Sequence, residues 1–291
     1  MPGFLRKMDP DIADDVVREL RTLWVHGSAA VGGNTLSLGE TAFFMEIGMT
    51  ESSRPLEEYQ EIAGHARAVD MVFSLVRSVR PIDETDLFRL HRALMSAGAD
   101  AGDFSAGAWK REPNGVYVHQ GDEMTYYEFA APDDVPCLMG QWLALLNRLS
   151  ASTHSLSAAA AAFATLHMAL VLIHPFCDGN GRMARLVSNL PVLRAGFPPI
   201  LIQRKHRDEY IHLLSAYKLA HGELDDGSCL LPENAQLHEF ARFCRSSMQL
   251  SMAVVAGALE RHQARRRPRP VEPSPGSAAR PRGLPSGATV S

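Results

Sequence analysis

Hydrophobic residues recur every three to four positions along most of the chain, which is the spacing of one face of an α-helix. The first such stretch opens at Asp9-Pro10, where a capping residue precedes proline, and it stops at the Gly27-Ser28 break. A helix then resumes near Ser37. The other predicted helices cover residues 57–78, 83–96, 134–149, 156–173, 181–195, 206–221 and 234–262. We expect Pro191 to kink or shorten its helix, since proline lacks the amide hydrogen that a helix interior needs.

Residues 107–130 and the C-terminal tail depart from this pattern. In the first stretch, valine, tyrosine and phenylalanine surround the turn signals Pro113-Asn114-Gly115 and Gln120-Gly121-Asp122, which favours a β-hairpin or an extended flap. From about Arg265 onward the chain is rich in proline, arginine, glycine and serine, and it lacks the apolar content needed to fold. The sequence therefore predicts an all-α fold with one small hairpin and a disordered tail.

Composition narrows the class of protein. With 291 residues, of which 46% are hydrophobic and 21% charged, the chain is typical of a globular protein. No apolar run approaches the roughly 20 residues that cross a bilayer, and the polar N-terminus does not resemble a signal peptide. We therefore expect a cytoplasmic protein with no membrane partner. A net charge of -4 gives no indication of a nucleic-acid partner. The cysteines form no CxxC pair and should be reduced thiols rather than disulfides or zinc ligands; they are Cys137, Cys177, Cys229 and Cys244.

The segment from His174 to Arg185, HPFCDGNGRMAR, lies between two stretches with helical spacing. His174 should therefore end one buried helix, and the tight turn Asp178-Gly179-Asn180-Gly181 should lead into the next. Glycines allow a positive φ in such a turn, and the free N–H groups at the start of a helix form a nest that binds anions. The turn is therefore a candidate phosphate site.

Side chains around that turn suit phosphate chemistry. Arg182 and Arg185 lie three positions apart, so both guanidinium groups can reach one phosphate chain. Asp178 could hold Mg²⁺, which takes its other ligands from water and substrate phosphates. His174 is a base whose ordinary pKa is about 6.5. Together these residues indicate phosphoryl or nucleotidyl transfer.

Other interpretations of the motif fit it less well. Asp-Gly-Asn-Gly by itself is commonly only a turn. It is similar to the start of a calcium loop, but such a loop would need glycine where Met183 stands, and Arg185 would intrude. The sequence has no GxxxxGK[ST] phosphate loop and no HExxH zinc motif.

The string HPFCDGNGRMAR resembles the signature of the Fic family, HPFx[DE]GNGRxxR, at every defining position. Members of that family typically transfer AMP from ATP to a protein hydroxyl, and they share an all-helical fold with a flap hairpin. The resemblance implies that His174 is the general base that takes the proton from a target Ser, Thr or Tyr. It also implies that Phe176 anchors the loop and that Asp178 orients Mg²⁺ on the α- and β-phosphates of ATP.

The resemblance assigns the phosphate contacts as well. Gly179, Asn180 and Gly181 would form an anion hole, with Asn180 on the α-phosphate. Arg182 would contact the β-phosphate and Arg185 the γ-phosphate. These assignments follow from the family pattern and not from the spacing of the residues.

The similarity covers roughly residues 20–250. It divides the chain into N-terminal helices over 1–55, a catalytic domain over 56–262 and the tail over 263–291. In the family the flap binds the target protein in extended form by strand addition, so we expect the protein substrate along the hairpin near 107–130. The oligomeric state stays open between a monomer and a homodimer.

The segment SAAVGGNTL, which begins at Ser28, matches a second family pattern except at one position. Many members have an inhibitory helix that reads SxAIEGNTL, and here Gly32 replaces its glutamate, followed by Gly33 and Asn34. In the family that glutamate pairs with the second arginine, here Arg185, and displaces the γ-phosphate. The resemblance therefore implies that autoinhibition is weakened or absent. The alternative is that the segment is only a glycine-rich turn.

Rival functions use the same residues. The site could transfer another nucleotide, or it could remove AMP from a modified protein, although removal in this family is thought to use the glutamate that Gly32 replaces. Some Fic-like proteins are regulators or toxin partners with an appended winged-helix module that binds DNA, but the residues after Pro232 leave little room for one. A non-catalytic scaffold that binds ATP is disfavoured by the intact His174.

Overall fold

α-Helices form almost all of the regular structure, as the periodicity predicts. The computed structural model of the chain describes residues 3–50, 53–78, 80–95, 106–120, 123–222, 224 and 234–266. Within these ranges the helices are α1 (Pro10–Gly32), α2 (Leu38–Ile47), α3 (Leu56–Arg77), α4 (Glu84–Met95), α5 (Val135–Ser152), α6 (Leu156–Ile173), α7 (Asn180–Val187), α8 (Asn189–Arg194), α9 (Arg207–His221), α10 (Ala235–Ser247) and α11 (Gln249–Arg266). Short 3-10 turns, η1 (Gly3–Leu5) and η2 (Arg204–His206), precede α1 and α9. The prediction of an all-α fold with one small hairpin is confirmed.

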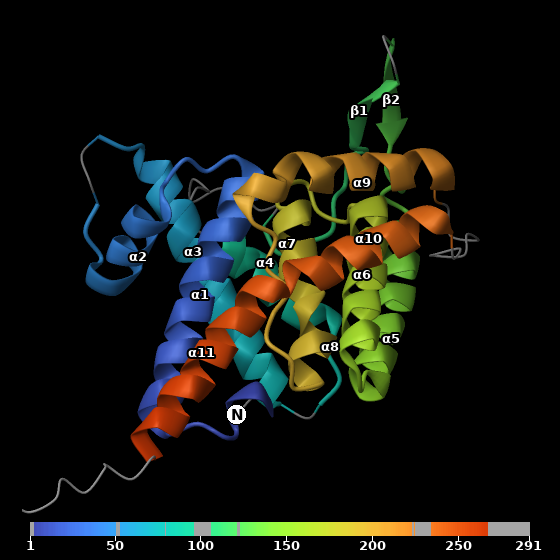
Figure 1. Cartoon of the computed structure of the whole chain (residues 1–291). Helices are drawn as coiled ribbons and strands as arrows, with labels where there is room; N and C mark the ends of the chain where they lie inside the picture. The colour runs from blue at the N-terminus through green and yellow to red at the C-terminus, as the bar shows by residue number, and fades with distance from the viewer. Residues whose placement is uncertain are drawn as a thin grey trace, which may run out of the picture.

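One continuous hydrophobic core holds the helices together, and it extends from Leu5 to Ala258. α6 packs against α5, α7, α8, α9 and α10, and its residues Phe163, Leu166 and Leu170 are fully buried (Figure 1). By length and composition α6 could cross a membrane, contrary to the expectation from the sequence, but most of it is buried inside the protein. Because α1 and the later helices share this core, the N-terminal helices pack as part of the same body. The division at residue 55 remains a prediction.

α1 does not stop at Gly27-Ser28, so that predicted boundary is wrong. Gly27 permits a close approach between segments, since a Cβ at this position would lie 3.0 Å from the carbonyl oxygen of Ile202. The helix continues to Gly32 and ends where Gly33 takes a left-handed φ of 114°. The Gly33 amide then bonds to free carbonyls of the last helical turn. The first glycine therefore serves packing, and only the later one ends the helix.

Two predicted helices are each divided in the structure. The range 181–195 becomes α7 and α8, which meet at Ser188, and Pro191 lies in the first turn of α8. This confirms that Pro191 shortens its helix, because proline is tolerated where no intrahelical amide bond is needed. The range 234–262 becomes α10 and α11, which meet at Met248. α11 continues to Arg266, and the rest of the predicted tail, 267–291, lies outside the described residues.

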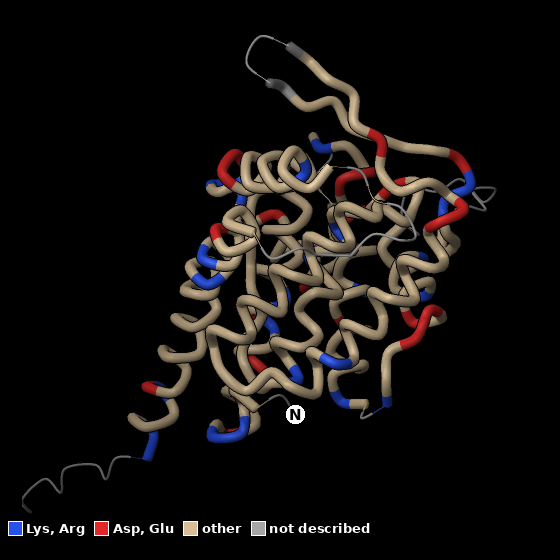
Figure 2. Tube along the Cα trace, turned by 90° about the vertical axis from the view of Figure 1, so that its right-hand side faces the viewer, with Lys and Arg blue, Asp and Glu red and all other residues tan. Residues whose placement is uncertain are grey.

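The predicted hairpin consists of β1 (Gly115–Gln120) and β2 (Glu123–Glu128), which pair antiparallel. It projects from the helical body near α9 (Figure 1). Figure 2 shows acidic and basic residues interspersed around the helical body, while the hairpin has few of either. Tyr117 and Tyr126 are exposed on the hairpin, with ring centroids 5.0 Å apart. The hairpin therefore presents an extended and largely uncharged surface.

Candidate active site

The loop between α6 and α7 brings the predicted site residues together. His174 ends α6 with a left-handed backbone, φ 51°, and it is the only residue other than glycine with a positive φ in the described ranges. Such a conformation costs about 1 kcal/mol or more, and it persists where the surrounding structure requires it. Gly179, with φ 74°, then turns the chain into α7, which begins at Asn180. The predicted helix end, tight turn and helix start are confirmed.

The His174 ring is held as a neutral base. Its Nδ1 lies 3.2 Å from the carbonyl oxygen of Val171, and because a carbonyl only accepts, Nδ1 donates and Nε2 keeps a free lone pair. The ring stacks on Phe129, next to the hairpin, with centroids 3.8 Å apart and an interplanar angle of 2°. Burial lowers the pKa of His174 to about 4. The imidazole is therefore unprotonated at neutral pH and can accept a proton at Nε2.

Phe176 and Asn180 close the loop from the inside. The Asn180 side chain is buried; it accepts a hydrogen bond from the Phe176 amide at 2.9 Å and donates one to the Phe176 carbonyl at 2.7 Å. Phe176 is fully buried, in agreement with its expected role as the anchor of the loop. Because the Asn180 side chain is used within the loop, the α-phosphate contact expected of Asn180 would have to come from its backbone amide.

His91 on α4 also supports the loop, and the sequence did not predict this role. Its ring stacks on Phe176 with centroids 3.9 Å apart. Its Nδ1 accepts a hydrogen bond from the Gly107 amide at 2.8 Å, so Nε2 carries the hydrogen and donates to the Asp178 carbonyl at 3.0 Å. In the sequence His91 is only a histidine within an amphipathic helix, and nothing in the local pattern connects it to a loop 87 positions away.

Asp178 is the acidic residue of the loop that a metal ion can reach. Its side chain is 75% exposed, and its carboxylate lies 3.1 Å from Arg182 Nη2. Mg²⁺ suits such a residue, since it is commonly held by one or two carboxylates together with water and phosphate oxygens. The described part of the chain has no cluster of three His, Cys, Asp or Glu residues that could hold a metal ion. Its cysteines are free thiols, namely Cys137, Cys177 and Cys244, and Cys229 lies outside the described residues.

Arg182 and Arg185 have different surroundings. Arg182 forms ion pairs with Glu61 on α3, from Nη1 to Oε1 at 3.0 Å, and with Asp178. Arg185 is buried, and its Nε and Nη2 donate to the hydroxyl and the carbonyl of Ser28, both at 2.9 Å. Among the described residues no carboxylate forms an ion pair with Arg185. A buried cation without an anionic partner is energetically costly, so Arg185 is well suited to bind an anion.

The segment that matches the inhibitory helix contacts Arg185 directly, and it also contacts Glu61, the partner of Arg182. Ser28 binds Arg185, and Gly32 is the last residue of α1. Apart from its own helical turn, a Cβ on Gly32 would have Glu61 Oε1, 3.9 Å away, as its one neighbour within 4 Å among the described residues. Asn34 donates to Glu61 Oε2 at 2.9 Å. The alternative of a glycine-rich turn is wrong for residues 28–32, which are helical, and the turn begins only at Gly33.

A cavity of about 230 Å³ connects the base with the second arginine. It lies between α6, α7, α9 and the hairpin, and its walls are mostly apolar. His174 and Arg185 line it together with Tyr210 and Lys218 of α9. The Tyr210 hydroxyl lies 3.3 Å from Arg185 Nη1 and 3.0 Å from His167 Nε2. The α9 residues were not predicted from the sequence because they show only helical spacing.

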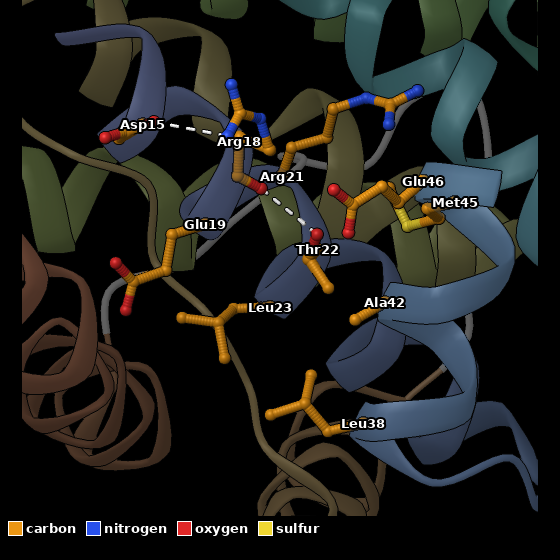
Figure 3. Close-up of a pocket in the computed structure, with 10 residues that line it drawn as sticks. All are labelled: Asp15, Arg18, Glu19, Arg21, Thr22, Leu23, Leu38, Ala42, Met45 and Glu46. Carbon is orange, nitrogen blue, oxygen red and sulfur yellow. Dashed lines mark hydrogen bonds and ion pairs between the residues drawn. The ribbon is translucent and has the colours of Figure 1, made fainter. Parts of the chain in front are cut away.

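A larger hollow of about 660 Å³ lies between α1 and α2 (Figure 3). Asp15 and Arg18 form an ion pair at 3.2 Å in its wall, and Leu23 and Leu38 lie on opposite sides of it. None of the residues that the sequence predicts for the site lines this hollow. The candidate chemistry therefore belongs to the smaller cavity at His174.

Comparison with known proteins finds relatives of this chain. Residues 81–192 match the family model described as Fic/DOC family. Proteins named protein adenylyltransferase Fic from Drosophila erecta and Drosophila melanogaster are each 34% identical to this chain over 192 residues, which is 65% of this chain and 36% of theirs. The chain therefore spans only about a third of the length of these relatives.

Two solved structures share the fold. A Fic domain containing signaling protein from Bacteroides thetaiotaomicron superposes with a TM-score of 0.72 at 24% identity, covering 87% of this chain and 93% of that one. Fic-1 from C. elegans superposes with a TM-score of 0.66 at 26% identity, covering 90% of this chain and 69% of that one. The fold expected from the motif is therefore confirmed over most of the chain.

Proposed function

We propose that this chain, which belongs to the Fic/DOC family, is a protein adenylyltransferase that transfers AMP from ATP to a hydroxyl side chain of a target protein. The observation that supports this most is Arg185, a buried guanidinium that has no carboxylate partner among the described residues and lines the same cavity as His174. A neutral base and an unpaired cation at one cavity are what nucleotidyl transfer to a hydroxyl needs. Relatives named protein adenylyltransferase support the same reaction.

The phosphates of ATP would bind along the start of α7. The free amides of the first turn of α7 and the guanidinium of Arg185 both attract anions. Arg185 is already oriented by Ser28 and Tyr210, so little rotational freedom is lost when a phosphate arrives. Binding an anion there also compensates a charge that is otherwise buried alone.

His174 would act on the attacking hydroxyl. Its Nε2 takes the proton while the hydroxyl oxygen forms a bond to the α-phosphorus of ATP. The bond between the α-phosphorus and the oxygen of the β-phosphate breaks, and pyrophosphate leaves with that electron pair. Stacking on Phe129 and the hydrogen bond to Val171 hold the ring in one orientation through this step. Mg²⁺, if bound by the exposed Asp178, would neutralise phosphate charge.

The cavity would bind the nucleoside part of ATP. Its apolar walls, with Tyr210 and Lys218 on one side, suit a flat base, while Gly181 and Arg185 in the same lining leave the phosphates at the start of α7. The protein substrate would bind along β1 or β2 of the hairpin, where an extended segment can add a strand. Preference for ATP over other nucleotides is part of the proposal.

Regulation, location and assembly are part of the same proposal. Because Gly32 has no side chain to occupy Arg185, we expect activity without an activating partner. The cytoplasmic location expected from the sequence stays a prediction. A homodimer also stays a prediction, and light scattering would test it. The surface to test is the group of exposed apolar side chains on α2 and in the residues after it, namely Phe43, Ile47, Met49 and Leu56.

The deciding experiment is a transfer assay with each labelled nucleoside triphosphate, the purified protein and a cell lysate, read by mass spectrometry of the modified proteins. We expect AMP on Ser, Thr or Tyr residues with ATP only, and none with the His174→Ala variant. Transfer of another nucleotide would replace the substrate assignment. The absence of transfer from every nucleotide would overturn the proposal and favour a binding protein.

A further inference from the structure

Carboxylates pair with the first arginine of the loop, whereas none of the described carboxylates pairs with the second. Arg182 Nη1 lies 3.0 Å from Glu61 Oε1, and Nη2 lies 3.1 Å from Asp178 Oδ2. Arg185 donates only to neutral groups, namely Ser28 and the Tyr210 hydroxyl. An incoming phosphate therefore meets no competing carboxylate from the described residues at Arg185, but it must compete with Glu61 and Asp178 for Arg182.

Of the two acids on Arg182, Glu61 is held more firmly. The Glu61 side chain is 22% exposed, while that of Asp178 is 75% exposed. The second oxygen of Glu61 accepts a hydrogen bond from Asn34 Nδ2 at 2.9 Å, and Asn34 is itself buried and bound to the Glu58 carbonyl. Exposed ion pairs contribute little free energy, whereas a fixed and partly buried carboxylate keeps its geometry.

Glu61 also faces the position where the family glutamate is missing. In the part of the chain that the structure describes, its Oε1 would be the one atom outside the same helical turn within 4 Å of a Cβ on Gly32, at 3.9 Å. The Glu61 carboxylate therefore lies beside the end of α1, but it pairs with Arg182 and not with Arg185. Asn34, which follows Gly32 in the same segment, binds this carboxylate from the other side.

We propose that Glu61 is a further residue of the nucleotide site, which acts through Arg182. In the free enzyme it holds the Arg182 guanidinium, and the phosphates of the nucleotide must displace it before Arg182 can bind them. Glu61 thus lowers the affinity for nucleotide by competing with the phosphates for Arg182. It does so from α3, next to Gly32, which has no side chain of its own to compete. This inference rests on the proposed function, because it assumes that phosphates bind at the start of α7.

Glu61→Gln tests the inference with little change of shape. Glutamine keeps the length of the side chain and an oxygen for Asn34, but it removes the charge that pairs with Arg182. We expect the Kd for ATP, measured by titration calorimetry with Mg²⁺ present, to fall about two- to fivefold, the range that partly exposed ion pairs support. The matched control is Glu58→Gln on the same helix, since Glu58 binds Thr35 and does not contact Arg182. The Kd of the Glu58→Gln variant for ATP should stay at the wild-type value.

A double-mutant cycle separates a specific pair from a general effect of charge. In the Arg182→Gln background, Glu61→Gln should no longer change the Kd, because the group through which Glu61 acts is gone. An equal gain of affinity in both backgrounds, or in Glu58→Gln, would overturn the inference. So would weaker binding by Glu61→Gln, which would mean that Glu61 orients Arg182 for the phosphates. If the wild-type protein does not bind ATP at all, the proposed function itself fails, which is a distinct result.

Discussion

Replacing Gly32 by glutamate should restore the carboxylate that the family pattern places opposite Arg185. Gly32 is helical, and outside its own helical turn a Cβ there meets no atom of the described residues closer than 3.9 Å, so the side chain can be accommodated. It lies one turn after Ser28, on the same face of α1, and Ser28 already binds Arg185. The new carboxylate would therefore start close to the only buried guanidinium of the loop that lacks an acid among the described residues.

The size of the effect follows from the kind of bond that forms. A hydrogen bond to a charged group contributes about 1.5–3 kcal/mol, so ATP should bind roughly 10- to 100-fold more weakly to Gly32→Glu. Stability should change little, because the gain of about 0.5 kcal/mol in helix propensity is offset by a negative charge near the C-terminal end of α1. Repulsion from Glu61 would bring the effect on ATP toward the lower end of the range.

The measurement is the Kd for ATP together with the rate of auto-modification at matched ATP. Gly32→Gln is the control, since it adds the same bulk without the charge. Equal affinities for the glutamate and glutamine variants would refute the reasoning, because they would show that a carboxylate at position 32 does not reach Arg185. Equal rates for the wild-type protein and Gly32→Glu would also mean that the match to the inhibitory helix has no functional consequence.

Further outcomes test the base, the metal ligand and the buried histidines. His174→Ala should lower the transfer rate by about 10²–10⁴ while the Kd for ATP stays nearly unchanged; a variant with full activity would remove His174 from the mechanism. Asp178→Ala should abolish the dependence of the rate on Mg²⁺ with only a small shift of Tm, since the side chain is 75% exposed; unfolding would instead assign Asp178 to the turn. Since the pKa of His174 is lowered to about 4, the transfer rate should stay constant as the pH falls from 7 to near 5 and decline only as His174 becomes protonated, which a pH–rate profile checks. Burial also lowers the pKa of His65 to about 3, so both histidines bind protons in the unfolded chain first, and the Tm should fall as the pH drops from about 6.5 toward 4. A flat Tm in that range would contradict the burial of these rings.

The sequence by itself determined the features that depend on neighbours in the chain. The 3.6-residue periodicity predicted nearly every helix, and turn residues around 107–130 predicted the hairpin. His174 at a helix end and Asp178 to Gly181 in a tight turn could be placed because these positions need only local backbone preferences. Local reasoning was wrong about the break at Gly27-Ser28, and it predicted undivided helices over 181–195 and 234–262 where the structure has two helices each. At Gly27 a tertiary contact with Ile202 outweighed a local preference.

Only the tertiary structure decided which distant residues serve the loop. Arg182 and Arg185 are three positions apart and chemically identical, yet one is paired with Glu61, 121 positions away, and the other with Ser28, 157 positions away. His91 and Phe129, which orient the loop and the base, also come from elements that the motif does not include. Local pattern cannot predict these pairs, because they depend on how α1, α3, α4 and the hairpin pack around α6 and α7. The charge that each arginine meets, and so its part in binding a nucleotide, is a property of that packing.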